Sequence, residues 1–195
     1  MAGKIPASSA VNGKIRGSAD LGYTSFDDIF KKFQSMVYSI ALRYTGNRDD
    51  ALEVAQESFI KIYKGLPNFR GDSKLSTWIY RITVNQALMQ NRGKRKFTEM
   101  PDIPNNSEYF GSIADAVEMM GEQDRRRFVN AALEQLNPED STILVLYYLE
   151  GQSVEEIAQI MRLGESNVKV KLFRGRNRLH EKLRGMLKLE VKSLL

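Results

Sequence analysis

The segment from Gly151 to Lys182 constrains the fold most, because its pattern describes two helices separated by a short break. Ser153 and Glu156 form a capping box, in which two side chains satisfy the exposed amides of a helix start, so the first helix is expected to begin there. Apolar residues at helical spacing give this helix one buried face, made of Val154, Ile157, Ala158 and Met161. Arg162-Leu163-Gly164 interrupts the pattern, and a second helix is expected from about Glu165.

The second of these helices is rich in cations. Its buried side is expected to carry Val168, Leu172, Leu179 and Leu183. Basic residues crowd its first three turns, at Lys169, Lys171, Arg174, Arg176 and Arg178. Two helices joined by a short Gly-containing turn, with a basic second helix, are typical of a helix-turn-helix that reads DNA. Basic amphipathic helices without a DNA role share this pattern, so the segment alone leaves both interpretations open.

Charge is distributed unevenly along the chain. The net charge is +5 and the sequence pI is about 9.3, which favours an anionic partner. Residues 98–124 contain no Lys or Arg but seven acids, namely Glu99, Asp102, Glu108, Asp115, Glu118, Glu122 and Asp124. The remainder has 29 basic residues against 17 acidic ones. We therefore expect two DNA-facing modules joined by a segment that avoids DNA.

Residue types exclude several classes of protein. The absence of cysteine excludes disulfides, thiolate metal sites and cysteine nucleophiles. The one histidine, His180, has no second histidine with which to share a metal. Without a phosphate-binding glycine motif or a paired acid and base, we expect no enzyme, catalytic residue, metal or cofactor. No apolar run reaches the roughly 18 residues that span a bilayer and no signal-peptide core is present, so we expect a cytoplasmic protein without membrane insertion.

Helical periodicity organises the chain into two all-α domains. Residues 1–22 are small, polar and Gly-rich, and we expect a disordered tail. Three helices are expected in residues 23–96: one from Phe26 to Gly46-Asn47, one from near Arg48 to Gly65, and one from about Ser73 to Arg92. Residues 97–124 form an acidic linker, with a helical turn expected around 113–120. Residues 125–195 form a second domain, in which Asn137 and Pro138 start a helix ahead of the helix-turn-helix.

The inward-facing residues of the first domain follow from the same spacing. They are Phe26, Ile29, Phe30, Phe33, Val37, Ile40, Ala41 and Tyr44 in the first helix, Ala51, Val54, Ala55, Phe59, Ile62 and Tyr63 in the second, and Leu75, Trp78, Ile79 and Ile82 in the third.

A second motif runs from Phe69 to Asn85 and reads FRGDSKLSTWIYRITVN. A Gly-containing loop leads into a helix that carries aromatic rings, Arg81, Asn85 and several hydroxyls. Aromatic stacking and edge hydrogen bonds are how proteins hold unpaired bases, so this loop could hold one. The alternative is that Phe69 and Trp78 are core aromatics.

This motif resembles region 2 of the extracytoplasmic-function sigma factors, whose pattern is approximately F-R-G-x-S-x-F-x-T-W-L-Y-R-I-A-x-N. Residues 51–59 (ALEVAQESF) resemble the preceding element of that family, and residues 136–183 resemble its region 4. The match covers about residues 26–96 and 128–184 in the expected order. The resemblance implies a sigma factor that binds core RNA polymerase, through its β′ and β subunits, and directs promoter recognition and DNA melting.

The resemblance also implies roles for individual residues. Glu53, Gln56, Glu57 and Phe59 would bind the core polymerase. The −10 element would be bound by Phe69, Arg70, Gly71, Asp72, Ser73, Trp78, Arg81, Val84 and Asn85. The −35 element would be bound by Ser166, Asn167, Lys169, Val170, Lys171, Phe173, Arg174 and Arg176. Many family members are held inactive by an anti-sigma factor, and the resemblance leaves such a partner open for this chain.

Several residues depart from the family pattern. Leu52 replaces an acid on the polymerase-facing helix, and Gly175 replaces the usual Ala, at a cost of about 1 kcal/mol in helix stability. Lys169 and Val170 stand where Arg and Ser are frequent, so the −35 sequence is open. The alternative function is a stand-alone helix-turn-helix regulator whose N-terminal helices dimerise or sense a signal. The Gly-containing loop at 69–73 argues against a stand-alone regulator, because a helical dimerisation bundle does not need such a loop.

Overall fold

The structure is a computed structural model that describes residues 25–90 and 120–193, with side chains described as far as residue 187. Within these ranges every regular element is a helix, which confirms the all-α prediction. The expected tail at 1–22 and most of the expected linker at 97–124, including its helical turn, lie outside the described residues. None of the described helices is long and apolar enough to cross a membrane.

The N-terminal bundle consists of α2 (Phe26–Thr45), α3 (Arg48–Gly65), the short 3₁₀ helix η1 (Leu66–Asn68) and α4 (Leu75–Gln90). The boundary of α2 is set by Ser25, which forms a capping box with Asp28, and by Gly46, which adopts a left-handed φ of 71°. Asn47 then caps α3 by accepting a hydrogen bond from the amide of Asp50. The third helix begins at Leu75 and not at Ser73, because residues 69–74 form the loop that precedes it.

The C-terminal bundle consists of α6 (Glu122–Glu134), α7 (Pro138–Tyr148), α8 (Val154–Met161) and α9 (Glu165–Ser193). The helix α6 begins three residues before the expected Arg125, so two of the acids counted toward the linker lie in its first turn, where a helix dipole favours negative charge. The expected caps at Asn137 and Ser153 are confirmed. Sequence reasoning correctly placed the start of α9 near Glu165.

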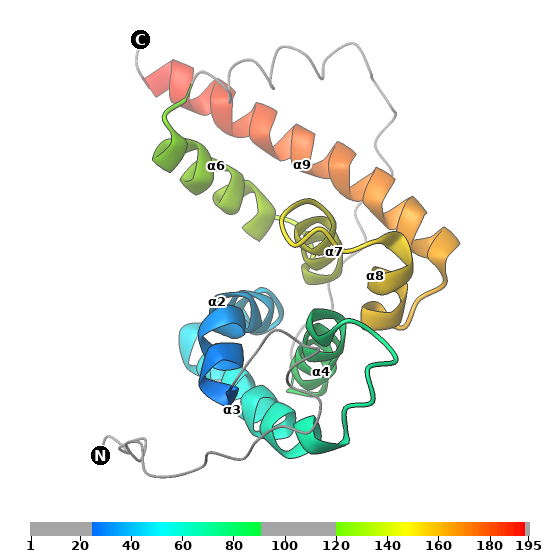
Figure 1. Ribbon diagram of the computed structural model, residues 1–195. Helices are drawn as coiled ribbons and strands as arrows, with labels where there is room; N and C mark the ends of the chain where they lie inside the picture. Colours follow the sequence, from blue (N-terminus) through cyan, green and yellow to red (C-terminus); the bar gives the residue numbers. More distant parts are fainter. Residues whose placement is uncertain (1–24, 91–119, 194–195) are drawn as a thin grey trace, which may run out of the picture.

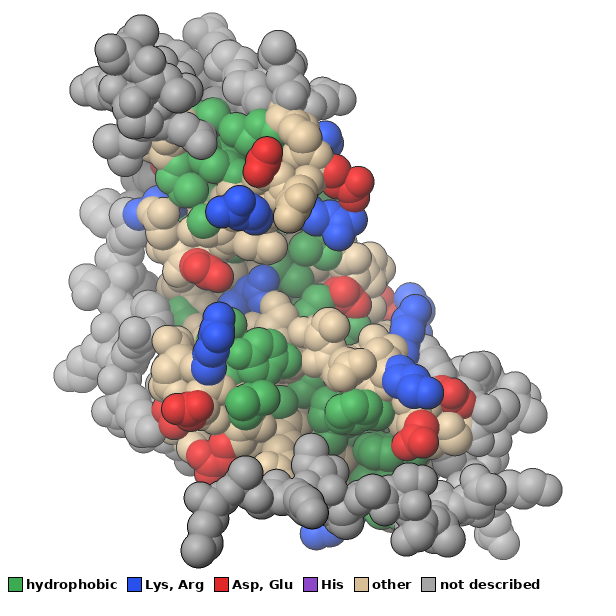
Figure 2. All heavy atoms as spheres, turned by 90° about the vertical axis from the view of Figure 1, so that its left-hand side faces the viewer, with side chains coloured by type: hydrophobic (Ala, Val, Ile, Leu, Met, Phe, Trp, Pro, Cys, Tyr) green, Lys and Arg blue, Asp and Glu red, His purple; other side chains and the backbone are tan. Residues whose placement is uncertain are grey.

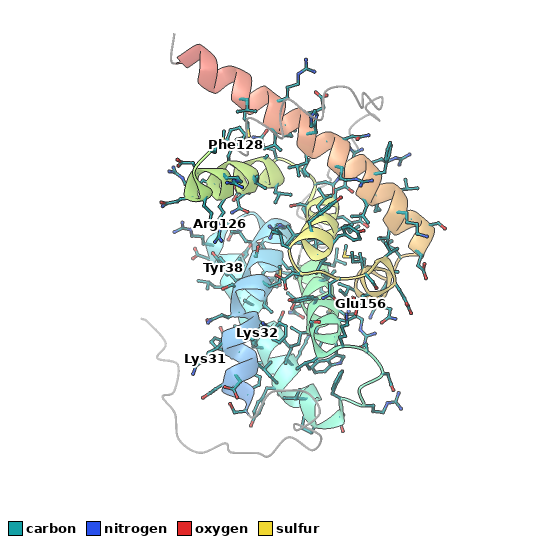
Figure 3. All side chains as sticks on the ribbon, turned by 45° about the horizontal axis from the view of Figure 1, so that its top comes forward. Lys31, Lys32, Tyr38, Arg126, Phe128 and Glu156 are labelled. Atoms are coloured by element: carbon teal, nitrogen blue, oxygen red, sulfur yellow. The ribbon has the colours of Figure 1, made fainter. Side chains whose placement is uncertain are left out.

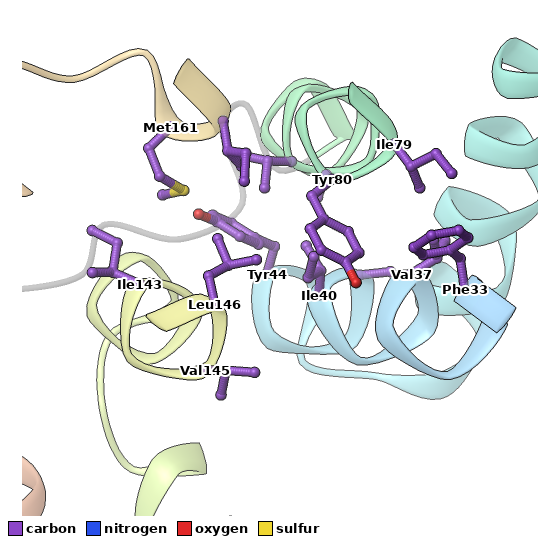
Figure 4. Close-up of a cluster of buried hydrophobic side chains, with 14 of the residues drawn as sticks. Phe33, Val37, Ile40, Tyr44, Ile79, Tyr80, Ile143, Val145, Leu146 and Met161 are labelled. Atoms are coloured by element: carbon purple, nitrogen blue, oxygen red, sulfur yellow. The ribbon is translucent and has the colours of Figure 1, made fainter. Parts of the chain in front are cut away.

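The two bundles pack against each other and share one hydrophobic core. Figure 1 shows α8 between α4 and α9, and contacts also join α2 to α7. Tyr44 of α2, Tyr80 of α4, Leu146 of α7 and Met161 of α8 belong to the same buried cluster (Figure 4). Burial of the Tyr44 hydroxyl raises its pKa, and the carboxylate of Glu139 raises it further. Helical periodicity within each domain gave no sign of this packing between them.

Two of the residues expected inside the first domain lie at its surface. Phe30 and Tyr63 are both about two-fifths exposed, although each contacts another ring of the same aromatic cluster. The ring of Tyr63 packs edge-on against Phe26 at a centroid distance of 5.1 Å, and Phe30 packs against Phe59 at 4.7 Å. The aromatic cluster therefore closes one end of the bundle and remains partly open to solvent.

Candidate nucleic-acid interface

The helix-turn-helix is formed by α8, a short turn and α9. The capping box at Ser153 and Glu156 starts α8, and Arg162 ends it in the left-handed region, with φ 56° and ψ 44°. The residue that takes the positive φ is therefore Arg162 and not the nearby Gly164. Backbone hydrogen bonds from Leu163 to Ala158 and from Val168 to Gly164 close the turn. Val168 is fully buried, so it anchors the first turn of α9 against the rest of the bundle.

One side of the first turns of α9 is open to solvent. The apolar side chains of Val170 and Phe173 lie outside the core, and they are 45% and 43% exposed. The other exposed residues of this face are polar or cationic: Ser166, Asn167, Lys169, Arg174 and Arg176. An exposed helix face that combines cations with a few apolar side chains suits a DNA major groove, because phosphates attract the cations and thymine methyl groups contact apolar atoms.

Two of the cations on α9 point toward α7. The Nζ of Lys171 lies 3.1 Å from Oε2 of Glu139, and Arg178 pairs with Asp140. The second pair is buried, with side-chain exposures of 12% and 2%, and Asp140 also accepts a hydrogen bond from Asn137. Breaking such a pair costs several kcal/mol, so Arg178 fixes α9 to α7. The expected role of Lys171 in DNA binding stays a prediction, and in this conformation its ammonium pairs with Glu139 of α7.

Gly175 lies where α9 packs closely against Leu144 of α7. A Cβ atom at this position would lie 3.3 Å from both Cγ and Cδ1 of Leu144. The glycine is buried and its backbone is helical, so it is required for space and not for conformational freedom. The expectation that Gly175 only costs helix stability therefore omitted its packing role in α9.

Tyr148, at the end of α7, was missed by sequence reasoning. Its hydroxyl accepts a hydrogen bond from Nη1 of Arg176 at 3.2 Å, and its ring packs edge-on against Tyr147. Both rings are exposed beside α9. No local signal in the sequence links Tyr148 with Arg176, because 28 residues separate them.

The loop from Phe69 to Ser73 lies at the start of α4 and on the same side of the molecule as the first turn of α9, at the right of Figure 1. Gly71 adopts φ 79°, a conformation that side-chain-bearing residues rarely take. The rings of Phe69 and Trp78 pack at a centroid distance of 5.2 Å. The ring of Trp78 in turn needs Gly65, since a Cβ there would lie 3.0 Å from its Cζ2 atom. Both rings of this aromatic pair are thus partly buried and partly exposed.

Three of the expected −10 residues share one stripe of α4. Trp78, Arg81 and Asn85 are partly exposed and recur at helical spacing, so they follow the loop along a single face. Val84 does not belong to this stripe, because it is 1% exposed and packs in the core. The expected contact of Val84 with a base is corrected: this side chain supports the stripe from inside.

The expected polymerase-binding residues lie on α3. Glu53, Gln56 and Glu57 are exposed, whereas Phe59 is 8% exposed within the aromatic cluster and cannot form the outer surface. Leu52 and Ile60, which sequence reasoning did not select, are exposed hydrophobic residues of the same helix. Figure 2 shows the side of the molecule that lies at the left of Figure 1, away from the first turns of α9, and there hydrophobic, basic and acidic side chains are interspersed.

Comparison with known proteins gives one family for both bundles. The family model described as Sigma-70 region 2 matches residues 29–97, and that described as Sigma-70, region 4 matches residues 126–179. The RNA polymerase sigma-H factor of Pseudomonas aeruginosa is 32% identical over 175 residues, which cover 84% of this chain and 89% of that protein. The ECF RNA polymerase sigma-E factor of Escherichia coli strain K12 is 34% identical over 172 residues, with the same coverage of both chains.

Solved structures share the fold. The sigma factor RpoE in complex with the anti-sigma factor NepR from Bartonella quintana superposes with a TM-score of 0.57, at 23% identity, over 82% of this chain and 96% of that one. CnrH in complex with the cytosolic domain of CnrY also gives a TM-score of 0.57, at 19% identity, over 88% and 97%. With matches in both bundles and relatives along most of its length, this chain belongs to the sigma-70 family, in the extracytoplasmic-function group.

Proposed function

We propose that the chain binds core RNA polymerase and directs it to promoters, where it helps to open the DNA. Residues 23–96 act as the region 2 domain and residues 125–195 as the region 4 domain, with residues 97–124 as the linker. The observation that supports this proposal is the presence in one chain of two separate exposed surfaces whose side chains suit contacts with DNA. One is the aromatic loop and stripe of α4, and the other is the exposed face of α9.

The surface on α9 binds the −35 element as a duplex. Lys169, Arg174 and Arg176 contact phosphates, and each phosphate neutralised makes the affinity fall with salt by about 0.9 logarithmic units per tenfold change. Val170 and Phe173 face the base edges, where good contacts discriminate by about 1–3 kcal/mol. Ser166 and Asn167 lie at the start of the helix, beside the same groove.

The surface on α4 takes up the opened strand of the −10 element. Extruding a base from a duplex costs a few kcal/mol, and a loop already shaped by Gly71, Phe69 and Trp78 offsets part of that cost. Arg81 and Asn85 lie against neighbouring bases along the stripe. The chain supplies binding energy and no catalytic group, because the polymerase carries out the chemistry.

The core polymerase contacts the exposed side of α3, which presents Glu53, Gln56 and Glu57 together with Leu52 and Ile60. This surface combines apolar side chains with polar ones, as a protein–protein interface with an apolar core and a polar rim does. The protein therefore acts in the cytoplasm, where the polymerase works. An anti-sigma factor remains a prediction for this chain; RpoE was solved in complex with the anti-sigma factor NepR, and CnrH in complex with the cytosolic domain of CnrY.

A selection experiment separates this function from a stand-alone regulator. A pool of random duplex DNA is incubated with the chain alone, with core polymerase alone and with both, and the retained DNA is sequenced. We expect two enriched motifs at a constant spacing only when both proteins are present. Enrichment of a single motif by the chain alone, unchanged by core, would support the stand-alone regulator and contradict the proposal.

The role of Asn85 is tested separately with matched variants. Asn85→Ala should impair promoter opening, measured by permanganate reactivity of unpaired thymines, while leaving core binding intact. Gln86→Ala, at the next residue of the same helix, is the control and should open promoters normally. An equal loss of core affinity in Asn85→Ala would place this residue on the polymerase surface instead.

A further inference from the structure

The last residue of α7 carries a side chain that the proposed function does not use. Tyr148 is 53% exposed and ends α7 beside the basic face of α9. Its hydroxyl oxygen accepts a hydrogen bond from Nη1 of Arg176 at 3.2 Å. Because water can replace an exposed hydrogen bond, this contact adds little to the free energy of folding. Its main consequence is the placement of the Arg176 side chain.

The close approach of α7 and α9 determines which of their side chains meet. Gly175 packs against Leu144, where an added Cβ would lie 3.3 Å from the leucine side chain. Tyr148 follows Leu144 by four residues and lies on the same face of α7, and Arg176 directly follows Gly175. In Figure 3, α7 lies beside the middle of α9, and side chains fill the space between the two helices. The glycine contact therefore brings the tyrosine ring within reach of the arginine.

Two ion pairs hold the same two helices together at the other end of α7. Lys171 lies 3.1 Å from Glu139, and Arg178 pairs with Asp140 in a buried site. Both acids belong to the first turn of α7, whereas Tyr148 is its last residue, so α7 is tied to α9 along its whole length. The tyrosine therefore projects from a helix whose position relative to the exposed face of α9 is fixed.

A neighbouring ring restricts the orientation of Tyr148. The ring of Tyr147 packs edge-on against it, at a centroid distance of 5.0 Å and an interplanar angle of 80°, a favourable geometry for two aromatic rings. A tyrosine has only two side-chain torsions to fix, whereas an arginine has more and loses more entropy when it is held in place. A hydrogen bond to a rigid tyrosine thus narrows the range of positions that the guanidinium of Arg176 can take.

Arg176 lies on the stripe of α9 that faces solvent. Lys169, Phe173 and Arg176 are all exposed and recur at helical spacing, so they share one face of the helix. A guanidinium has five N–H donors, and the contact with Tyr148 uses one of its nitrogen atoms. The other nitrogen atoms keep the planar, forked arrangement of donors that matches a phosphate group. The tyrosine therefore orients the arginine without preventing it from binding an anion.

We infer that Tyr148 is a positioning residue for DNA binding, which holds the guanidinium of Arg176 toward a phosphate at the edge of the −35 groove. This inference rests on the proposed function. Tyr148 acts through Arg176 and contacts no base, so it raises the affinity for duplex DNA of any sequence and leaves the choice of sequence to Val170 and Phe173. The last residue of α7 thus contributes to −35 binding although it lies outside the helix-turn-helix.

A double-mutant cycle tests whether Tyr148 acts through Arg176. Tyr148→Phe keeps the ring and removes only the hydroxyl, and it is combined with Arg176→Ala. Tyr63→Phe is the matched control, because Tyr63 is 43% exposed and also belongs to an edge-on aromatic pair, on α3. Dissociation constants of the full chain with core polymerase are measured on duplex DNA from the selection, at low temperature and over a range of salt concentrations. Urea unfolding of each variant shows whether it is as stable as the parent chain.

We expect Tyr148→Phe to weaken binding by about fivefold, as the loss of a hydrogen bond from a charged donor does. Arg176→Ala should weaken binding more, and should reduce the slope of log affinity against log salt by about 0.9. In the Arg176→Ala background, Tyr148→Phe should change the affinity by less than about twofold, because the group that it positions is gone. Both losses should be the same on DNA whose −35 motif has been replaced, since a phosphate contact carries no sequence information. Tyr63→Phe should bind like the parent chain.

Two results would overturn the inference: normal binding by Tyr148→Phe, or an equal loss from Tyr148→Phe with and without Arg176. Failure of the proposed function has a different signature, because the chain would then bind its DNA equally well without core polymerase. The same cycle on that DNA, with the chain alone, would still decide whether Tyr148 positions Arg176. A chain that binds no DNA with or without core polymerase would contradict both proposals.

Discussion

Gly175→Ala tests how closely α9 packs against α7, because close packing reverses the sign of the expected change in stability. In an open helix, replacing Gly by Ala stabilises by about 1 kcal/mol. Here the new Cβ would lie 3.3 Å from two atoms of Leu144, and the side chain of Leu144 is itself buried at 2% exposure. Overpacking of a core typically costs about 1–3 kcal/mol. The two effects leave an expected net loss of about 1 kcal/mol.

A control substitution and a second background separate the effect of crowding against Leu144 from the helix propensity of alanine. Gly185→Ala, on the same helix with nothing within 4 Å of its added Cβ, should stabilise by about 1 kcal/mol. Leu144→Ala alone should cost about 2–5 kcal/mol, because it leaves a cavity. In the Leu144→Ala background, Gly175→Ala should become stabilising by about 1 kcal/mol, since its obstacle is gone. The coupling between the two sites is then about 2 kcal/mol.

Urea unfolding followed by helical circular dichroism measures all of these variants. If Gly175→Ala stabilises the parent chain as much as Gly185→Ala does, the close approach of α9 to α7 is refuted. The glycine would then only reduce the stability of α9, as the sequence alone suggested.

Three further predictions follow from other contacts. Asp140→Ala should lower the free energy of unfolding in urea by about 3–5 kcal/mol, because it leaves Arg178 buried without this carboxylate. Glu122→Ala, at an exposed ion pair, should lower it by less than about 1 kcal/mol. Similar losses in the two variants would refute the role of Arg178 in fixing α9 to α7. Partial burial raises the pKa of Glu156, but hydrogen bonds from Lys74 and Ser153 outweigh that effect, so the net pKa lies below its ordinary 4.5. The stability that the ionised carboxylate contributes should be present above pH 4.5 and should be lost as the pH falls through the lowered pKa. Glu156→Gln should remove this part of the pH dependence of the melting temperature. Gly65→Ala should displace the ring of Trp78 and change the emission of this single tryptophan, whereas an unchanged spectrum would show that the ring has room to spare.

Local sequence signals predicted the elements well, because caps and periodicity act within one helix. Asn47, Asn137 and Ser153 each start a helix by bonding an amide three residues ahead, so their effect is visible in the sequence itself. The left-handed Arg162 was not predictable in the same way, since Gly164 was the residue that turn preference favoured.

The candidate surfaces were predicted only in part, because burial depends on what packs against a helix. Phe59 and Val84 fit the family pattern, but both lie inside. Lys171 and Arg178 contribute to the basic pattern of α9, yet acids of α7 some 30 residues away turn them toward the protein. The hydrogen bond between Thr77 and Gln152 could not be predicted at all, because the two residues are 75 positions apart and belong to different motifs.

Run-off transcription tests the central claim most directly. A template carrying the two motifs obtained from the selection is transcribed by purified core polymerase with the chain, without it, and with the Asn85→Ala variant. We predict a single run-off product that requires both the chain and the motifs, and that the variant strongly reduces. Specific binding of the chain to the template without any motif-dependent transcript by core polymerase would contradict its assignment as a promoter-specificity subunit.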